Sequence, residues 1–297
     1  MLTIGISSRA LFELKDGHRI YIDQGPEAFD AYMLENEQKP LRPGVAFNLV
    51  KKLLALNIPG QDAAVRVILL SSNTLNAGAR VMNSVRHYGL NIETALFTSG
   101  GDRFRLAKAA NLSMFLSTNP TEVKKALELG IPSATVLPDS IVSASQDAAL
   151  CIAFDGDAVL FGDDAERVNH TQGLAAFQEY EKKNAGIPLS DGPFKAVLQE
   201  LCRIQSGFLD RPAQERPIRL ALVTARGTPA SDRVLTTLRS WGLQVDEALF
   251  CGGMPKGPFL HALGADLFFD DGMHNIESAV QFVPACHVPH GIVGSMQ

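Results

Sequence analysis

The stretch that decides the fold is Cys-Ile-Ala-Phe-Asp-Gly-Asp-Ala-Val-Leu-Phe, at residues 151–161. It begins as an apolar run and then sets two carboxylates, Asp155 and Asp157, on either side of Gly156. An apolar run that stops at charge is typical of the carboxyl end of a buried parallel strand, where open α/β sheets bind ligands. Residues two apart on a strand point the same way, so both carboxylates can face one reacting group. Taken alone, two acids after a strand are more often a solvated turn or a helix N-cap.

A second predicted strand, Arg219 to Val223, runs into Thr224-Ala225-Arg226. A hydroxyl at a strand end can donate a hydrogen bond to a phosphate oxygen. The alternative is that Thr224 caps the helix expected near Ala230 to Trp241.

Two further motifs follow. The loop Cys251 to Pro258 carries Lys256 at a predicted helix start. That lysine can hold an anionic nucleophile and a phosphate, or it can be a solvated residue at a turn. The apolar run Leu267 to Phe269 then ends in paired acids, Asp270 and Asp271.

The order DxD, Thr, Lys, DD resembles the four motifs of the haloacid dehalogenase-like phosphohydrolases. The sequence in and around these motifs is similar to one group within them, the cytosolic type I 5'-nucleotidases. This similarity spans nearly the whole chain. The strings that carry it are Ser7–Phe12, Phe154–Phe161, Leu222–Arg226, Leu238–Leu243, Asp246–Phe250, Pro255–Pro258 and Phe268–Asp271.

The chemistry implied by this resemblance is phosphate monoester hydrolysis, which is extremely slow without a catalyst. A carboxylate nucleophile divides the reaction into two steps through an aspartyl-phosphate. A dianionic phosphate ~4 Å from a carboxylate is repelled by about 8 kcal/mol at an effective dielectric near 20. A divalent cation between the two anions removes that obstacle, and oxygen ligands favour Mg²⁺.

The resemblance also implies roles for the acidic residues. Asp155 is the expected nucleophile and a Mg²⁺ ligand. Asp157 is expected to protonate the leaving nucleoside 5'-oxygen, to deprotonate the attacking water and to bind the metal through its backbone carbonyl. Asp270 is expected to be the remaining metal carboxylate, with Asp271 a second or water-mediated ligand.

Substrate contacts are expected from four residues. Thr224 and Lys256 would hold the phosphoryl oxygens, with Lys256 also pairing with Asp155, and Gly253 lies in the same loop as Lys256. Arg226 would reach the phosphate or the ribose, or else form a surface salt bridge.

The segment 163–217 is the predicted cap. Its Asp163 or Asp164 is expected to cap a helix with Glu166 in the first turn, rather than to form a second metal site. Phe177, Tyr180 and Phe194 are each expected to be helix core residues, with stacking on a base as the alternative.

An internal repeat links the two halves of the chain. Residues Arg66 to Phe115 align with Arg219 to Phe268 at a constant offset of 153, and Ile6 to Phe12 align with Phe154 to Leu160 at an offset of 148. The predicted fold is therefore α/β, with two tandem haloacid dehalogenase-like halves on mostly parallel sheets. The halves are residues 1–146 and 147–297.

The repeat predicts that the first half is catalytically silent, because it lacks the carboxylates of the second. The aligned pairs are Asp155/Ser7, Asp157/Arg9, Thr224/Ser71, Lys256/Arg103, Asp270/Ser117 and Asp271/Thr118.

This half could still bind an anion through Ser7, Arg9, Ser71, Arg103 and Thr118, since arginines and hydroxyls suit a phosphate without metal. A regulatory nucleotide, ADP or ATP by resemblance, is the hypothesis. The alternative is a role in packing or dimerisation only.

The composition of the chain argues against nucleic-acid-binding, membrane and secreted proteins. The chain has 297 residues, 46% of them hydrophobic, and a net charge of −5 without a basic run, which argues against nucleic-acid binding. We expect no membrane span and no signal peptide, because Met1 to Ile6 looks like a first strand. The four cysteines, all in the second half, look like reduced cytosolic thiols, so a cytoplasmic location is expected.

The sequence therefore predicts Mg²⁺-dependent hydrolysis of nucleoside 5'-monophosphates, AMP first, with a homo-oligomer as a further expectation. Two alternatives remain open. One is a sugar-phosphate phosphatase or nucleoside phosphotransferase on the same core. The other is a nucleotide-sensing binding protein.

Overall fold

A computed structural model of the chain describes residues 1–141 and 149–294. The predicted boundary between the halves, at residue 146, lies outside the described residues.

One ten-stranded sheet runs through the described part of the chain, in the order β10-β9-β8-β11-β12-β7-β6-β1-β4-β5. Neighbouring strands are parallel except β7 and β12, which pair antiparallel. The predicted α/β class with a mostly parallel sheet is confirmed. The strands are β1 Leu2–Ile6, β4 Val65–Ser71, β5 Thr94–Phe97, β6 Met114–Ser117, β7 Ser133–Val136, β8 Leu150–Phe154, β9 Ile218–Thr224, β10 Glu247–Phe250, β11 Leu267–Asp270 and β12 Ala285–His287. A small antiparallel sheet pairs β2 (Phe12–Glu13) with β3 (Arg42–Pro43).

The strand order reads the same outward from the β7–β12 junction in both directions. One side gives β7-β6-β1-β4-β5 and the other gives β12-β11-β8-β9-β10. β8 begins 148 residues after β1 (Leu150 against Leu2), and β9 begins 153 residues after β4 (Ile218 against Val65). These are the two offsets of the sequence repeat.

Helices cover both faces of the sheet, because its central strands are apolar on both sides. β8, for example, is buried along its whole length. The helices are α1 Ser8–Leu11, α2 Lys15–Gln24, α3 Pro26–Glu35, α4 Phe47–Leu54, α5 Leu75–His87, α6 Phe104–Ala109, α7 Pro120–Glu128, α8 Asp164–Lys183, α9 Lys195–Ser206, α10 Ser231–Trp241, α11 Gly257–Leu263, α12 Met273–Ala279 and α13 Gly291–Gly294. No helix in the described residues is long and apolar enough to cross a membrane.

The two sides of the β7–β12 junction share one core. Helix α4 contacts both β4 and β8, and helix α9 contacts both β9 and β1. The largest hydrophobic cluster accordingly contains residues from both, such as Ile4, Leu69, Ile152 and Leu222.

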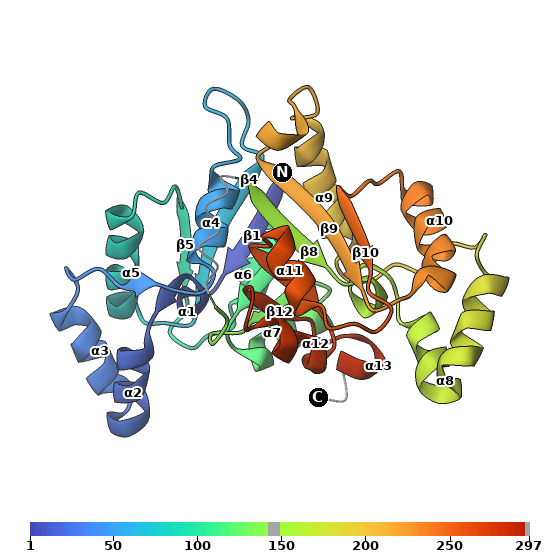
Figure 1. Ribbon diagram of the computed structural model, residues 1–297. Helices are drawn as coiled ribbons and strands as arrows, with labels where there is room; N and C mark the ends of the chain where they lie inside the picture. Colours follow the sequence, from blue (N-terminus) through green and yellow to red (C-terminus); the bar gives the residue numbers. More distant parts are fainter. Residues whose placement is uncertain (142–148, 295–297) are drawn as a thin grey trace.

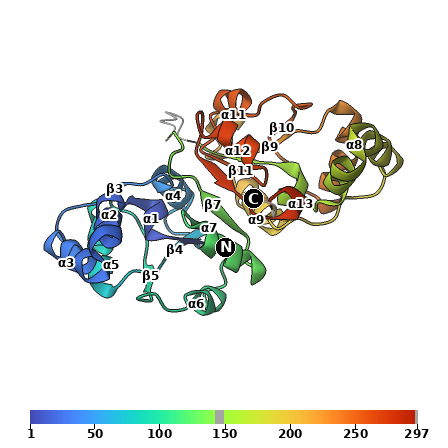
Figure 2. The same ribbon diagram turned by 90° about the horizontal axis from the view of Figure 1, so that it is seen from below.

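Helices α2 and α3 lie at one end of the molecule, and helix α8 lies at the other (Figures 1 and 2). The helix pair α2–α3 and the helix α8 each bend at a glycine with a left-handed backbone. Gly25 joins α2 to α3 at φ 90°, and Gly173 kinks α8 at φ 84°. These glycines are 148 residues apart, so the bend recurs at the offset of β1 and β8.

Candidate active site

The predicted site residues lie at the carboxyl ends of three neighbouring strands. Asp155 directly follows β8, Thr224 ends β9, and Asp270 ends β11. Because β9, β8 and β11 are adjacent and parallel, their last residues meet at one edge of the sheet. Lys256 stands at the N-cap of α11.

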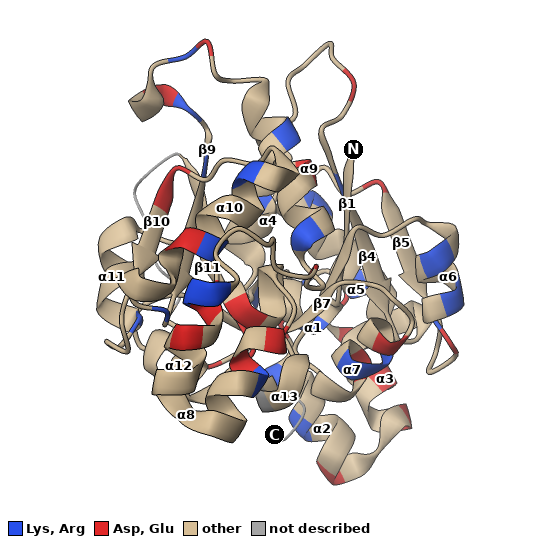
Figure 3. Cartoon of the chain, turned by 90° about the vertical axis from the view of Figure 1, so that its right-hand side faces the viewer, with Lys and Arg blue, Asp and Glu red and all other residues tan. Residues whose placement is uncertain are grey.

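A cavity of about 420 Å³ opens at this edge. The predicted residues that line it are Asp155, Asp157, Thr224, Arg226, Gly253 and Asp271. Lys256 and Asp270 are buried behind Asp155. In the view of Figure 3, acidic and basic segments are drawn close together near the labels of β11, α12 and α8.

Lys256 links two of the predicted metal ligands. Its Nζ is 2.8 Å from Asp155 Oδ1 and 2.6 Å from Asp270 Oδ2, and the side chain is only 1% exposed. Burial disfavours the charged ammonium, but Asp155 and Asp270 outweigh it and raise the pKa of Lys256. The lysine is therefore a permanent cation beside Asp155, as the sequence predicted for this pair.

Asp270 is held in place by donors from the following turn. Its Oδ1 accepts from the Gly272 backbone N–H at 2.8 Å and from Asn275 Nδ2 at 3.1 Å. Since Oδ2 contacts Lys256, the orientation of this carboxylate is set before any ligand binds.

Three carboxylates form a cluster suited to a cation. One oxygen from each of Asp155, Asp270 and Asp271 lies within 4.8 Å of the others. Asp271 Oδ2 is buried and has no hydrogen-bond partner among the described residues. Burial raises the pKa of Asp155 to about 7, with Lys256 opposing and Asp270 adding to the shift. Burial and then Glu166 raise the pKa of Asp271 to about 10. A cluster that binds protons this tightly fits a metal ion with oxygen ligands.

Glu166 faces the same cavity, although the sequence indicated only a residue in the first turn of a helix. It does lie in the first turn of α8, and it lines the cavity with Oε2 unpartnered among the described residues. Burial, followed by the charge of Asp157, raises its pKa to about 8. Asp163 occupies the N-cap position but makes no side-chain cap and pairs instead with Arg167 at 2.8 Å.

Asp157 and Arg226 form a bidentate ion pair. Arg226 Nε and Nη2 donate to the two oxygens of Asp157 at 2.8 and 2.7 Å. Arg226 also pairs with Glu181, whose other oxygen accepts from Arg233 at 2.8 Å. Arg226 is 4% exposed, so the expected alternative of a surface salt bridge is wrong.

Thr224 does not cap a helix, because the N-cap position of α10 is Ala230. Its hydroxyl oxygen instead accepts from the Arg226 backbone N–H at 3.3 Å, and this leaves the hydroxyl proton for another acceptor.

Of the predicted cap segment, only α8 lines the cavity, through residues such as Asn169, Leu174 and Phe177. The Phe177 ring packs under the Arg226 guanidinium at 5.2 Å. Helix α9 instead packs on the sheet, and residues 207–217 precede β9 at its opposite end. Phe194 is a fully buried core residue, as predicted.

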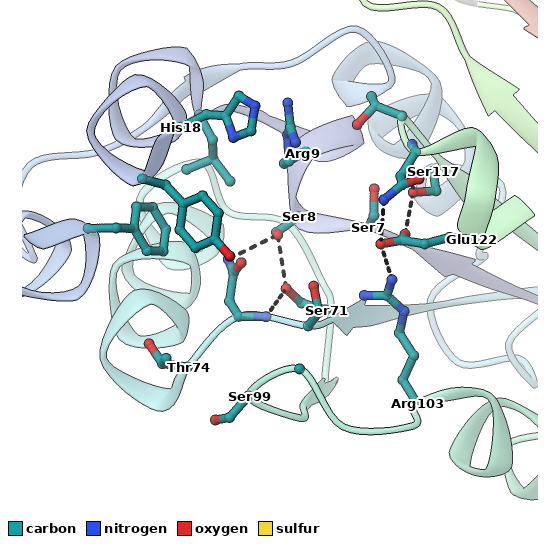
Figure 4. Close-up of a pocket in the computed structure, with 18 of the residues that line it drawn as sticks. Ser7, Ser8, Arg9, His18, Ser71, Thr74, Ser99, Arg103, Ser117 and Glu122 are labelled. Atoms are coloured by element: carbon teal, nitrogen blue, oxygen red, sulfur yellow. Dashed lines mark hydrogen bonds and ion pairs between the residues drawn. The ribbon is translucent and has the colours of Figure 1, made fainter. Parts of the chain in front are cut away.

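The predicted first-half residues gather around a second cavity, also of about 420 Å³ (Figure 4). Ser7, Arg9, Ser71, Arg103 and Thr118 all line it. The structure adds Glu122, which pairs with Arg103 and which the sequence did not indicate.

The fold and the first site define an α/β protein with a carboxylate cluster, a lysine and a hydroxyl at the carboxyl edge of a parallel sheet. The chain belongs to the 5'-nucleotidase family, whose sequence profile, described as 5'-nucleotidase, matches residues 1–295. This confirms the family that the motifs indicated.

Among relatives, the chain is similar to the human protein called Cytosolic 5'-nucleotidase 1B. The two are 41% identical over 288 residues, which make up 94% of this chain and 47% of the relative. The chain thus spans about half the length of that relative. No solved structure matches the chain.

Proposed function

We propose that the chain hydrolyses nucleoside 5'-monophosphates, AMP first, to nucleoside and phosphate in a Mg²⁺-dependent reaction. The observation that carries the proposal is the cluster of Asp155, Asp270 and Asp271 beside the buried Lys256. Family membership and the name of the human relative support the substrate class.

The proposed metal ligands are Asp155, Asp270 and Asp271, with the backbone carbonyl of Asp157. The unpartnered oxygen of Asp271 and the raised pKa values of Asp155 and Asp271 support this set. When bound, Mg²⁺ neutralises the negative charge shared by the phosphate and the carboxylates.

Asp155 is the proposed nucleophile. Its carboxylate oxygen bonds to phosphorus, and the bond from phosphorus to the nucleoside 5'-oxygen breaks while that oxygen takes a proton from Asp157. Water then attacks the aspartyl-phosphate, Asp157 accepts the water proton, and phosphate leaves with Asp155 restored.

Arg226 sets a condition on this role of Asp157. Both Asp157 oxygens accept from Arg226, so the carboxylate must exchange at least one of these bonds for the leaving oxygen. The same exchange would free an arginine N–H for the phosphate or the ribose. Thr224, Lys256 and Gly253 are the other proposed substrate contacts.

The test is phosphate release from a panel of nucleotides and sugar phosphates, with Mg²⁺ or with EDTA. We expect Mg²⁺-dependent release from AMP-like substrates, and Asp155→Asn should reduce it at least ~10³-fold. The matched control is Asp210→Asn, at an exposed residue outside the cavity, which should leave the rate unchanged.

Other outcomes would favour the alternatives. Release only from sugar phosphates, or transfer to an added nucleoside, would retain the chemistry and change the substrate or acceptor. A lack of metal-dependent release from every compound would contradict the proposal and favour a nucleotide-sensing protein.

We also propose that residues 1–146 are a silent copy of the catalytic half, 147–297, both of the haloacid dehalogenase type. Support comes from the common strand order and from Ser7, which lies where β1 ends as Asp155 does at β8. The name of the relative supports a cytoplasmic location. A regulatory nucleotide and a homo-oligomer stay predictions.

A further inference from the structure

The first-half cavity is lined by residues that correspond in sequence to those of the candidate active site. At an offset of 148 or 153, the paired lining residues include Ser7/Asp155, Arg9/Asp157, His18/Glu166, Tyr21/Asn169, Phe29/Phe177, Ser71/Thr224, Asn73/Arg226 and Thr118/Asp271. The two cavities therefore have one architecture and different chemistry.

The difference in chemistry is mainly one of charge. The candidate active site is lined by four carboxylates, those of Asp155, Asp157, Glu166 and Asp271, against the single arginine Arg226. The first-half cavity is lined by two arginines, Arg9 and Arg103, against the single carboxylate Glu122. An anion can enter the second of these environments without a metal ion.

Arg103 is a buried cation paired with a carboxylate at its cavity, as Lys256 is at the candidate active site. It pairs with Glu122, which also accepts from Ser117 Oγ at 2.7 Å and from Asn119 Nδ2 at 3.2 Å. Arg103 is 6% exposed, yet its Nε has no hydrogen-bond partner among the described residues. A buried, charged N–H without a protein acceptor can donate to a bound anion or to a water.

Arg9 supplies a second cation. It lines the cavity and is exposed, and its side chain forms no hydrogen bond or ion pair with any described residue. Buried hydroxyls line the same cavity, where Ser8 Oγ is 3.0 Å from Ser71 Oγ and accepts from Asn73 Nδ2 at 3.2 Å. Hydroxyls and two arginines around one cavity suit the oxygens of a phosphate group.

The side of the cavity formed by α2 and α3 is aromatic. His18 and Tyr21 of α2 stack with ring centroids 6.4 Å apart, and Tyr21 meets Phe29 of α3 edge-on at 6.1 Å. Tyr21 is 47% exposed, so its ring has area left to cover a ligand. A flat ring attached to a phosphate would reach this side.

We propose that the first-half cavity is a metal-independent binding site for a phosphate monoester that carries a flat ring. Arg9, Arg103, Ser8 and Ser71 hold the phosphate, and His18, Tyr21 and Phe29 pack on the ring. The ligand is not hydrolysed there, because Ser7 replaces the carboxylate nucleophile.

The test is calorimetric titration of the full chain carrying Asp155→Asn, in EDTA, so that neither metal nor turnover contributes. The probes are AMP, inorganic phosphate and adenosine. We expect saturable binding of AMP, weaker binding of phosphate, and the weakest of adenosine. Adding Arg9→Ala should weaken AMP binding about 10-fold or more, since a charge-assisted contact is lost. Arg105→Ala, at an exposed arginine outside the cavity, is the matched control and should have no effect.

Two further variants make the result decisive. Tyr21→Ala should weaken binding of AMP but not of inorganic phosphate. Lys256→Met, behind the other cavity, should leave binding in EDTA unchanged. No binding in EDTA, or binding that Lys256→Met abolishes and Arg9→Ala does not, would overturn the proposal. Because no turnover is measured, this result is independent of whether the second half hydrolyses nucleotides.

Discussion

At the scale of single residues, the candidate site places three carboxylates together before any ion is bound. Asp155, Asp270 and Asp271 are all buried, and Lys256 contacts only the first two. Burial disfavours the charged carboxylates, and the neighbouring negative charges add to this effect, so the pKa values of Asp155 and Asp271 rise to about 7 and about 10. Metal binding at this site must therefore compete with protons.

This competition predicts the pH dependence of metal binding. A carboxyl with a higher pKa in the folded protein holds its proton more tightly there, so Asp155 destabilises the metal-free protein as pH rises from about 4 to about 7. Mg²⁺ needs the ionised form, and we expect its apparent affinity to increase about 10-fold or more between pH 6 and pH 8. Calorimetric titration with Mg²⁺ at the two pH values would measure this. Asp271→Asn should weaken the dependence, and an affinity independent of pH would contradict the assignment of these ligands.

A second prediction concerns the buried ion-pair network. Arg226→Met would remove the partner of Asp157 and one of the two partners of Glu181, so we expect the free energy of unfolding to fall by about 3 kcal/mol. Arg203→Met breaks the exposed pair with Glu200 and should cost less than about 1 kcal/mol. Urea denaturation of both variants would measure the difference. Equal losses would show that the buried network adds nothing to stability.

At the scale of elements, α8 forms one wall of the candidate active site because it bends. Gly173 has φ 84°, and the residues that follow it, Leu174 and Phe177, line the cavity. The equivalent bend at Gly25 turns α3 so that Phe29 lines the first-half cavity. A straight helix in either place would carry these side chains away from their cavity.

The bend in α8 can be tested by substitution. In Gly173→Ala the added Cβ meets no atom, so strain from the left-handed backbone alone should cost about 1–2 kcal/mol. Relaxation of that strain would move α8, and we expect KM to rise more than kcat falls. Gly186→Ala is the control, because Gly186 has neither a left-handed backbone nor a close neighbour. Unchanged kinetics with normal folding would show that the bend does not position the cap.

At the scale of the whole molecule, one sheet and one core join the two sides of the β7–β12 junction. Lys52, in α4, donates to both oxygens of Asp266 at 2.7 and 2.9 Å and to the carbonyl oxygen of Ala149 at 3.0 Å. Asp266 in turn accepts from the Cys151 backbone N–H at 2.9 Å. Lys52, from the β7 side of the junction, therefore anchors the amino end of β8, the strand that Asp155 follows.

This cross-connection predicts cooperative unfolding. We expect one calorimetric transition for the chain, with equal calorimetric and van't Hoff enthalpies. Lys52→Met should lower the free energy of unfolding by about 2 kcal/mol, because the buried Asp266 loses its cation. Its exposed neighbour Lys51 serves as the control, and Lys51→Met should change stability by less than about 0.5 kcal/mol. Two separate transitions, of which Lys52→Met shifts only one, would show that the halves unfold independently.

The sequence by itself determined the local features of this protein. The ends of β8, β9 and β11 were predictable because each apolar run stops at a polar residue, and Asp155, Thr224 and Asp270 stand there. The two offsets of the repeat recur between β1 and β8 and between β4 and β9, and the motif strings identified the family. Such patterns are readable because periodicity and strand ends depend on residues close together in the chain.

Only the tertiary structure decided which distant residues meet. Glu166 of α8 lines the same cavity as Asp155 and Asp271, Glu122 becomes the partner of Arg103, and Arg226 is buried and pairs with both Asp157 and Glu181. The antiparallel pairing of β7 with β12, which makes one sheet of two halves, is likewise a long-range contact. None of these contacts has a local signal, because each depends on the approach of separate elements rather than on the pattern within any one of them.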